Sequence, residues 1–438
     1  MPKYEAYKDS GVEWLGDIPS SWELKPGFVA FSENKRNNKG MKENTVLSLS
    51  YGNIVVKPEE KLVGLVPESF ETYQLVEPDD IIVRCTDLQN DKVSLRTGLA
   101  KNKGIITSAY LNLRVKNGFD ARFLHYYLHA LDTTKVLYKF GSGLRQNLSF
   151  LDFKRLPIFE IPEDTQKLIA NYLEKKTAQV DDAIAIKEQQ ISLLKERKQI
   201  IIQQAVTQGL DPNVPMKDSG VDWIGKIPAH WGCTAVKRLL DIPITDGPHT
   251  TPQLHDEGIP FISAEAIKGG EINFDKKRGY INEKDYLLFS NKYTPKVNDI
   301  YMVKSGATTG RVAIVRTEMK FTIWSPLAVF RVDKNKLNPL YLYYFLQSYS
   351  FLKGVELSWS FGTQQNIGMG VLGNLFALAP PLEEQQLIVN SIEPHFREID
   401  IASEQVYQQI EKLKEYKTTL INSAVTGKIK ITPEMVEQ

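Results

Sequence analysis

The sequence predicts an α+β protein in which two globular domains alternate with two long helices that pair with each other. Three observations support this prediction: a fifteen-residue stretch occurs twice, a longer stretch also occurs twice, and part of the longer stretch carries a seven-residue apolar pattern. The chain has 438 residues, of which 42% are apolar and 24% charged. This composition is enough to build cores in two to four domains.

The two repeats divide the chain into halves. The stretch KDSGVEWLGDIPSSW begins at Lys8, and KDSGVDWIGKIPAHW follows 209 residues later with ten of fifteen positions identical. The second repeat begins at Gln146 and again at Gln365, an offset of 219, and continues without a gap to Thr207 and Thr426. The inserts between the repeats therefore differ in length, and their sequences show no convincing similarity. Each half consists of a repeated frame, a variable insert and a long closing segment.

The closing segments are predicted to be helices. Residues 163–207 contain no Gly or Pro, and Pro162 stands just before them, as expected near a helix N-terminus. Two interleaved series recur every seven residues and are mostly apolar: Leu173, Val180, Lys187, Leu194 and Ile201 with Thr177, Ile184, Ile191, Lys198 and Ala205 in the first copy, and Ile392, Ile399, Val406, Leu413 and Leu420 with Phe396, Ser403, Ile410, Lys417 and Ala424 in the second. This spacing is typical of a coiled coil, and two copies of equal length favour pairing with each other over an ordinary bundle. Pro394 predicts a kink or a delayed start in the second helix.

The inserts, residues 23–155 and 232–376, are each predicted to be a compact α+β domain. Runs such as DIIVRC, GIITSAYLNLRV, DIYMVKSG and RVAIVRT are typical of strands, whereas ARFLHYYLHAL and NPLYLYYFLQSY are typical of short helices. With the repeated frame included, we expect a first domain over 1–162, a helix over 163–208, a second domain over 209–381, and a helix with a tail over 382–438.

Charge and cysteine content point to a cytoplasmic protein with two mildly basic regions. The net charge is only +1, but the first insert holds 20 Lys and Arg against 15 Asp and Glu, and the second holds 17 against 13. A modest basic excess of this kind is common on surfaces and only suggests nucleic-acid binding. The two cysteines, Cys85 and Cys233, lie far apart, which favours a reducing compartment. We expect neither a signal peptide nor a membrane span.

Few motifs of catalysis occur. The sequence has no GxxxxGK[ST] phosphate loop and no Asn-Pro-Pro-aromatic tetrapeptide of the kind that amino-methyltransferases use, and the FGSGL stretch at 140–144 is a weak match to a cofactor loop. His249 and His255 are the best metal ligands, but without a neighbouring cysteine they are expected in an exposed or DNA-facing loop. We therefore predict no catalytic residue, no metal and no cofactor in this chain.

Polar loops near positive charge are the candidates for DNA contact. Arg can bind guanine in a bidentate manner, Asn and Gln can bind adenine, and Lys neutralises phosphate. For any single one of these residues, an ordinary surface turn is the simpler explanation. The candidates are Ser50, Tyr51, Arg84, Thr86, Asp87, Gln89, Asn90, Lys92, Arg96, Arg145 and Gln146 in the first half, and His249, Thr250, Thr251, Lys304, Ser305, Thr308, Thr309, Arg311, Thr363, Gln364 and Gln365 in the second.

Over its whole length the chain resembles the specificity subunits of type I restriction–modification enzymes, the systems that bacteria use in phage defence. The matching stretches are GDIPSSWEL and GKIPAHWGC at the start of each insert, FGSGLRQNLSFLDFKRLPIFEIP and FGTQQNIGMGVLGNLFALAPP at their ends, and KERK and KEYK in the helices. The ordered double set is specific to this family. The second loop is shortened from FGSGLRQN to FGTQQN, which is a departure from the first copy.

The resemblance implies a pseudo-twofold molecule without catalytic activity. Each insert would be a target recognition domain that reads one half of an asymmetric, bipartite sequence in double-stranded DNA. The helices would pair antiparallel, fix the gap between the half-sites and dock two modification subunits, which bind S-adenosylmethionine and methylate adenine. Restriction subunits, which are motor–nucleases, would join through that complex. Two alternatives stay open: a coiled-coil scaffold for other proteins, and a self-contained methyltransferase or nuclease.

Overall fold

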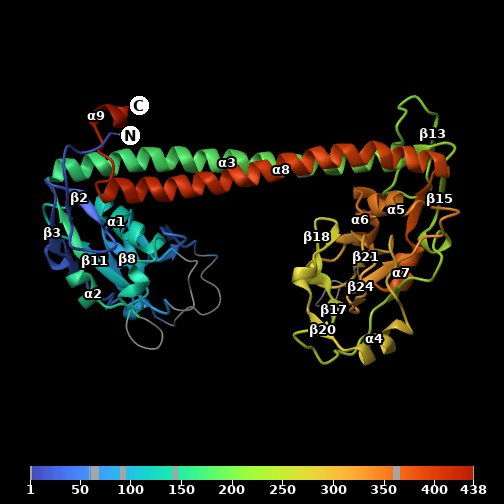
Figure 1. The fold of residues 1–438 in the computed structure, drawn as a ribbon, viewed down its shortest axis with the longest axis horizontal. Coiled ribbons are helices and arrows are strands. Elements are labelled where there is room, and N and C mark those ends of the chain that lie inside the picture. Colours follow the sequence, from blue (N-terminus) through green and yellow to red (C-terminus); the bar gives the residue numbers. More distant parts are fainter. Residues whose placement is uncertain are drawn as a thin grey trace. The chain divides into compact units, whose positions relative to one another are not determined.

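The computed structural model describes residues 2–58, 60, 69–88, 95–141, 147–358 and 366–437 (Figure 1). The chain forms two compact units. The first comprises Met1–Glu188 with Tyr407–Gln438, and the second comprises Gln189–Val406. Each unit therefore contains one globular domain together with one half of each long helix. We refer to the inserts at 23–155 and 232–376 as the first and second domain.

The first unit holds a four-stranded antiparallel sheet in the order β4-β11-β8-β9, with smaller two-stranded sheets around it. Its helix α1 packs beside β9, and its main core is formed by apolar residues of the sheet, α1, α2 and the long helices. Its elements are β1 Tyr7–Asp9, β2 Asp17–Pro19, β3 Glu23–Pro26, β4 Phe31–Glu33, β5 Leu47–Ser50, β6 Asn53–Val56, β7 Gln74–Val76, β8 Ile81–Val83, β9 Thr97–Leu99, β10 Gly104–Ile106, β11 Leu111–Val115, α1 Ala121–Thr133, α2 Phe150–Arg155, β12 Pro157–Glu160 and α9 Pro433–Glu437.

The second unit holds an equivalent four-stranded antiparallel sheet, in the order β16-β24-β21-β22. A second sheet has the order β20-β17-β23, in which β17 is antiparallel to β20 and parallel to β23, and the helix α4 follows β20. Its elements are β13 Met216–Asp218, β14 Lys226–Pro228, β15 Gly232–Ala235, β16 Thr245–Asp246, β17 Ile259–Ile262, β18 Ile267–Lys268, β19 Glu271–Ile272, β20 Gly279–Ile281, α4 Glu283–Ser290, β21 Ile300–Val303, β22 Val312–Ile314, β23 Thr322–Ile323, β24 Leu327–Phe330, α5 Pro339–Phe345, α6 Tyr349–Leu357, α7 Met369–Asn374 and β25 Phe376–Ala379.

The two inserts thus share a framework that their sequences do not reveal. In the first domain Ile81 of β8 faces Leu99 of β9, and in the second Ile300 of β21 faces Ile314 of β22. The strand at or just after the end of each insert also pairs with the first strand of that insert: β12 with β3, and β25 with β15. Sequence comparison finds no convincing similarity between the inserts, because a buried strand position accepts any well-packed apolar residue and so loses sequence identity before it loses structure.

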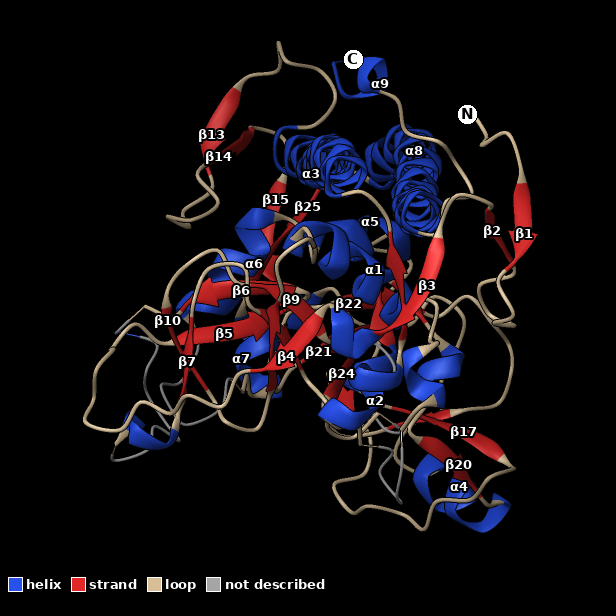
Figure 2. Cartoon of the chain, turned by 90° about the vertical axis from the view of Figure 1, so that its left-hand side faces the viewer, coloured by secondary structure: helices blue, strands red, loops and turns tan. Residues whose placement is uncertain are grey.

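The two long helices occur where the sequence predicts them. Helix α3 spans Glu163–Gln208, and α8 spans Leu382–Val425 with Pro394 inside it, so the proline does not delay the helix start. They lie side by side (Figures 1 and 2). All twenty residues of the predicted seam are buried or half-buried, and the exposed residues of both helices lie outside it. The apolar repeat therefore identifies the packed face of each helix.

Within each unit the helices run antiparallel. In the first unit Lys417 lies 2.7 Å from Asp181, and the α3 residues before Asp181 share a core with Leu420 and the α8 residues after it. In the second unit Lys198 lies 2.5 Å from Asp400, and later α3 residues share a core with earlier α8 residues. Such exposed pairs contribute little free energy, about 0–1 kcal/mol, but they show the direction and register of the pairing.

A buried glutamine joins each long helix to its domain in the same way. Gln166 accepts a hydrogen bond from the Asp120 backbone N–H (3.0 Å), at the start of α1, and donates to the carbonyls of Gly118 and Ile161. Gln385, 219 residues later, accepts from the Asn338 N–H (2.7 Å), at the start of α5, and donates to two carbonyls in the same manner. The repeated sequence therefore specifies repeated contacts.

Candidate nucleic-acid interface

In the second domain, the segments predicted to contact DNA converge. Lys304, at the end of β21, lies 3.3 Å from Asp246, which is on the strand that precedes His249. The Lys304 carbonyl accepts a hydrogen bond from the Ile367 N–H (2.9 Å), and Ser305 forms a β-bridge with Asn366. Three stretches that are far apart in sequence, 245–251, 303–311 and the described end of the FGTQQN loop, therefore meet at one place.

Asp246 is the centre of this convergence. It is fully buried, and Lys292 donates to its Oδ1 and to the carbonyl of Gly247 (3.2 Å). The Lys304 Nζ and the His249 Nε2 lie 3.3 and 3.2 Å from its Oδ2. Burial acts to raise the pKa of Asp246, but the hydrogen bond and charge of Lys292 and the charge of Lys304 outweigh it and keep that pKa below its usual value. We call these four ionisable residues the Asp246 cluster.

The other predicted residues of the second domain differ in exposure. His249, Thr250, Thr251 and Arg311 are exposed, whereas Ser305, Thr308 and Thr309 are half-buried. Lys304 is only 9% exposed, so it supports the cluster from inside more than it reaches solvent. The hairpin between β21 and β22 turns at Gly306 and Gly310, which have φ values of 95° and 91°. Glycine suits these positions because side chains disfavour that conformation.

In the first domain, Arg96 was predicted to contact DNA from a polar loop. The structure instead places the Arg96 side chain inside the loop over residues 84–87. Its side chain is fully buried, and its guanidinium donates to the carbonyls of Arg84 (3.3 Å), Thr86 (2.8 Å) and Asp87 (3.0 Å). Its backbone N–H donates to the buried carboxylate of Asp132 on α1 (2.6 Å). Arg96 therefore shapes the 84–87 loop, and in this structure it does not face solvent.

The loop shaped by Arg96 adjoins the other end of the insert, as in the second domain. The Asp87 N–H donates to the Asn147 side chain (2.9 Å), and the Leu148 N–H donates to the Cys85 carbonyl (2.9 Å). The second of these bonds is the counterpart of the bond between Ile367 and Lys304. Thr86 is exposed, and Arg84 and Asp87 are half-buried.

Ser50 and Tyr51 lie at the tip of the β5–β6 hairpin. Tyr51 is 85% exposed and has a φ of 46°, which is unusual for a bulky residue. Ser50 is half-buried. The remaining candidates lie outside the described residues: Gln89, Asn90, Lys92, Arg145, Gln146, Thr363, Gln364 and Gln365.

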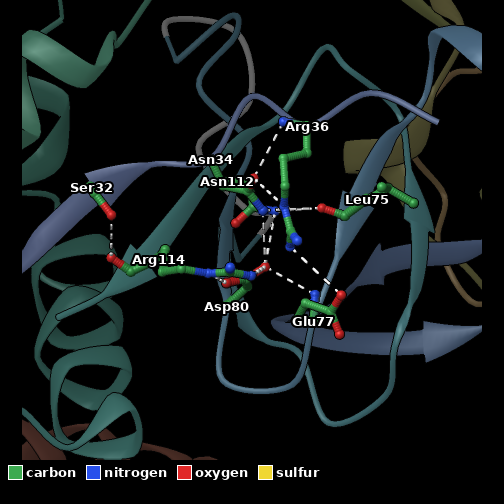
Figure 3. Close-up of polar contacts among 8 residues, drawn as sticks. All are labelled: Ser32, Asn34, Arg36, Leu75, Glu77, Asp80, Asn112 and Arg114. Atoms are coloured by element: carbon green, nitrogen blue, oxygen red, sulfur yellow. Dashed lines mark hydrogen bonds and ion pairs between the residues drawn. The ribbon is translucent and has the colours of Figure 1, made fainter. Parts of the chain in front are cut away.

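The sequence reasoning missed a buried ion pair that supports the sheet of each domain. Asp80, 1% exposed, accepts from the Arg114 Nε (2.9 Å) and from the amides of Asn34 (3.2 Å) and Asn112 (3.3 Å), as Figure 3 shows. It also accepts from the Glu77 N–H (3.0 Å) and so closes the turn before β8. The hydrogen bond with Asp80 raises the pKa of Arg114.

The second domain repeats this pair. Asp299, 1% exposed, binds the Arg331 guanidinium (2.6 Å) and accepts from the Lys296 N–H (2.8 Å) and the Tyr293 hydroxyl (2.6 Å). The sequence carries a weak signal for both ion pairs. The dipeptide Asp-Ile occurs at the start of β8 and of β21, and the dipeptide Arg-Val occurs at the end of β11 and directly after β24.

Neither a metal site nor a membrane span was found in the described part of the chain. Among those residues, no three His, Cys, Asp or Glu side chains are grouped so that they could hold a metal ion. No helix there is both long and apolar enough to cross a membrane.

Comparison with known proteins shows which proteins this chain is similar to. Residues 243–412 match the type I restriction modification DNA specificity domain. The chain is 25% identical to the type I restriction enzyme EcoBI specificity subunit of Escherichia coli, over 84% of this chain and 76% of that one. It is 23% identical to a Methanocaldococcus jannaschii chain provisionally named the type I restriction enzyme MjaX specificity subunit, over 95% and 96% of the two.

A solved structure shares the fold. It comes from work on complex assembly and conformational transition of a type I restriction–modification system, and it superposes with a TM-score of 0.66 at 16% identity, covering 93% of this chain and 98% of that one. These likenesses confirm the resemblance that the repeated motifs indicated: the chain is similar to the specificity subunits of type I restriction–modification enzymes.

Proposed function

We propose that this chain is the DNA sequence-recognition subunit of a type I restriction–modification complex, and that each domain reads one half of an asymmetric, bipartite target. One observation carries the proposal. The two domains have the same sheet and the same attachment to the long helices, yet the polar residues at their converging loops differ. A shared scaffold with different loops suits two readers of different sequences, since base readout depends on individual side chains.

In this proposal the paired helices form a coiled-coil spacer that sets the gap between the half-sites. The buried seam along α3 and α8 supports a rigid pairing. The helices and the repeated frame also dock two modification subunits, because a repeated frame offers two equivalent surfaces. Restriction subunits join through that complex, and the assembly works in the cytoplasm, where its DNA is.

The chain itself is not an enzyme, as for the specificity subunits that it is related to. We propose that it holds no cofactor and that S-adenosylmethionine binds to the modification subunit. The isolated chain is expected to transfer no methyl group to DNA and to show no binding of S-adenosylmethionine in calorimetry. Methyl transfer by the isolated chain would favour the self-contained methyltransferase instead.

The main test is a genome-wide map of methylated adenines in cells that carry this gene with its modification partner. The expected result is one bipartite motif with two different half-sites, which disappears when either gene is removed. If the motif persists without this chain, or if no motif appears while duplex binding is absent, the scaffold alternative is favoured.

The spacer is tested by inserting residues near Gln189. Four residues, about one helical turn, lengthen a helix by roughly 6 Å, which corresponds to one or two base pairs of about 3.4 Å each. We expect a longer gap with both half-sites unchanged. Two residues rotate the apolar seam away from its partner, and assembly is expected to fail. A four-residue insertion that changes a half-site instead of the gap contradicts the proposal that the helices set the gap.

A further inference from the structure

The Asp246 cluster borders a cavity that none of the features above explains. The cavity has a volume of about 340 Å³ and lies between the 246–250 loop and helix α4. Lys292 and His249 line it on the polar side, and Leu288 and Phe289 of α4 line it on the apolar side. The Lys292 and His249 side chains are 45% and 69% exposed, so both can reach a ligand from solvent.

The charges in this cluster do not cancel. One buried carboxylate faces two lysines, and therefore the cluster keeps a positive charge even when His249 is neutral. The Asp246 Oδ2 has no aligned hydrogen bond, although Lys304 and His249 stand close to it. Lys292 uses two of its three N–H groups on Asp246 and Gly247, which leaves one for another acceptor.

We propose that Lys292 and His249, both positioned by Asp246, bind one phosphate of the DNA backbone at the mouth of this cavity. This inference rests on the proposed DNA-reading function and adds a contact site to it. A phosphate oxygen fits because it accepts hydrogen bonds from ammonium and imidazole groups and because its charge balances the excess in the cluster. The exposed Thr250 lies beside His249 in the same loop and adds a hydroxyl donor.

Asp246 and Lys304 are positioning residues in this site. Both are at most 9% exposed, so neither offers an open surface to DNA. Gly247 fixes the loop, because a Cβ there would lie 2.0 Å from the Ile323 carbonyl oxygen. The loop that carries His249 is therefore held against β23.

Among its described residues, the first domain does not repeat this cluster at the equivalent positions. Cys85 is at the position where the second domain has Lys304. The Cys85 carbonyl accepts a hydrogen bond from the Leu148 N–H, and the Lys304 carbonyl accepts the equivalent bond from the Ile367 N–H. By strand register, Lys35 stands where the second domain has Asp246. At these described positions the phosphate contact is thus specific to the second half, which helps to orient an asymmetric protein on DNA.

The test measures duplex binding by the full-length chain as a function of salt, for a mixed-sequence duplex. Each lost phosphate contact lowers the slope of log K against log salt by about 0.9. We expect Lys292→Met to lower the slope by about that amount and to weaken binding severalfold, and His249→Gln to give a smaller loss. Lys353→Met is the matched control: it removes one lysine charge from α6, away from α4 in the same unit (Figure 1), and should leave the slope unchanged.

Asp246→Asn separates positioning from simple charge. The substitution adds one positive charge, so a charge effect alone would tighten binding, whereas loss of the anchor for Lys292 and His249 should weaken it. If this variant fails to fold in a thermal melt, the two exposed substitutions decide the matter. A Lys292→Met slope equal to that of wild type overturns the site but leaves DNA reading intact. A wild-type chain without salt-dependent duplex binding overturns the proposed function itself.

Discussion

The two globular domains have the same sheet but use equivalent positions differently. Arg96 lies directly before β9 and Arg311 directly before β22, the strands at the same end of the two sheets. The Arg96 carbonyl accepts a hydrogen bond from the Arg84 N–H, and the Arg311 carbonyl accepts the equivalent bond from the Val303 N–H. Arg96 is fully buried in its own loop, whereas Arg311 is exposed. One backbone position thus serves loop structure in one domain and is open to a ligand in the other, which shows that strand register alone does not determine a residue's role.

The domains also differ in how well their buried aspartates are satisfied. Asp80 keeps three further donors, from Asn34, Asn112 and Glu77, when its arginine is removed. Asp299 keeps the Tyr293 hydroxyl and the Lys296 N–H among the described residues. The arginine side chains are 38% exposed in the first domain and 17% in the second. The second pair is therefore the more dependent on its ion pair.

The largest expected difference between the domains follows from this. Arg331→Met leaves the carboxylate of Asp299 buried without its cation and should cost about 3–5 kcal/mol of unfolding free energy. Arg114→Met should cost about 1–2 kcal/mol, because amides and backbone still satisfy Asp80. Urea denaturation of the two full-length variants measures both values. Equal losses would show that the two pairs are energetically alike.

Acid should weaken the first domain more than the second. Helix α1 carries two half-buried histidines, His125 and His129. Burial of the imidazole lowers the pKa of His125 to about 3, aided by the charges of His129 and Lys101, and burial lowers the pKa of His129 to about 4, aided by the charge of Lys417. At the equivalent positions the second domain has Tyr343 and Gln347. A lowered folded pKa means that the unfolded chain takes up protons first, as pH falls below about 6.5, so stability is present above this pH and lost below it.

The expected loss is about 1.4 kcal/mol for each histidine at pH 5.5, or about 3 kcal/mol together. The double variant His125→Tyr/His129→Gln copies the second domain and should remove this part of the pH dependence. Denaturation of wild type and variant at pH 7.5 and pH 5.5 makes the comparison. If wild type and variant lose the same unfolding free energy between pH 7.5 and pH 5.5, carboxylates cause the acid sensitivity instead.

The two arginines at equivalent positions give the next largest contrast. Arg96→Met removes the donor for three loop carbonyls in a buried site and should cost about 2 kcal/mol, since unsatisfied buried acceptors are expensive. Arg311→Met should change stability by less than about 0.5 kcal/mol, because the side chain is exposed. Under the proposed function only Arg311→Met should weaken duplex binding in a protein of unchanged melting temperature. A destabilised Arg311→Met variant would contradict this difference.

The sequence predicted the frame better than the domains, for a physical reason. Helix α3 begins and ends within a residue of its expected bounds, since an unbroken heptad pattern and Pro162 mark it locally. The shared sheet was missed, because Ile81-Ile82-Val83 and Ile300-Tyr301-Met302 fill the same core with different apolar side chains. The convergence of His249 and Lys304 at Asp246 was also beyond local patterns, as it depends on which strands pair. The direction of the Arg96 side chain depends on carbonyls that only the folded loop brings together.

The smallest expected effect is one that the two halves should share. Gln166→Leu and Gln385→Leu each leave a helix N-cap N–H and two carbonyls without their buried partner. Water can reach part of each site from the exposed start of the long helix, so the cost should be about 1–2 kcal/mol rather than the sum of three lost bonds. Because both glutamines are fully buried and bind equivalent atoms, the two losses should agree within about 0.5 kcal/mol. Glu163→Gln, three residues before Gln166, serves as the control: it removes only an exposed ion pair with Lys167 and should cost less than about 0.5 kcal/mol. Clearly unequal losses would mean that the domains, and not the repeated frame, determine how strongly each helix is held.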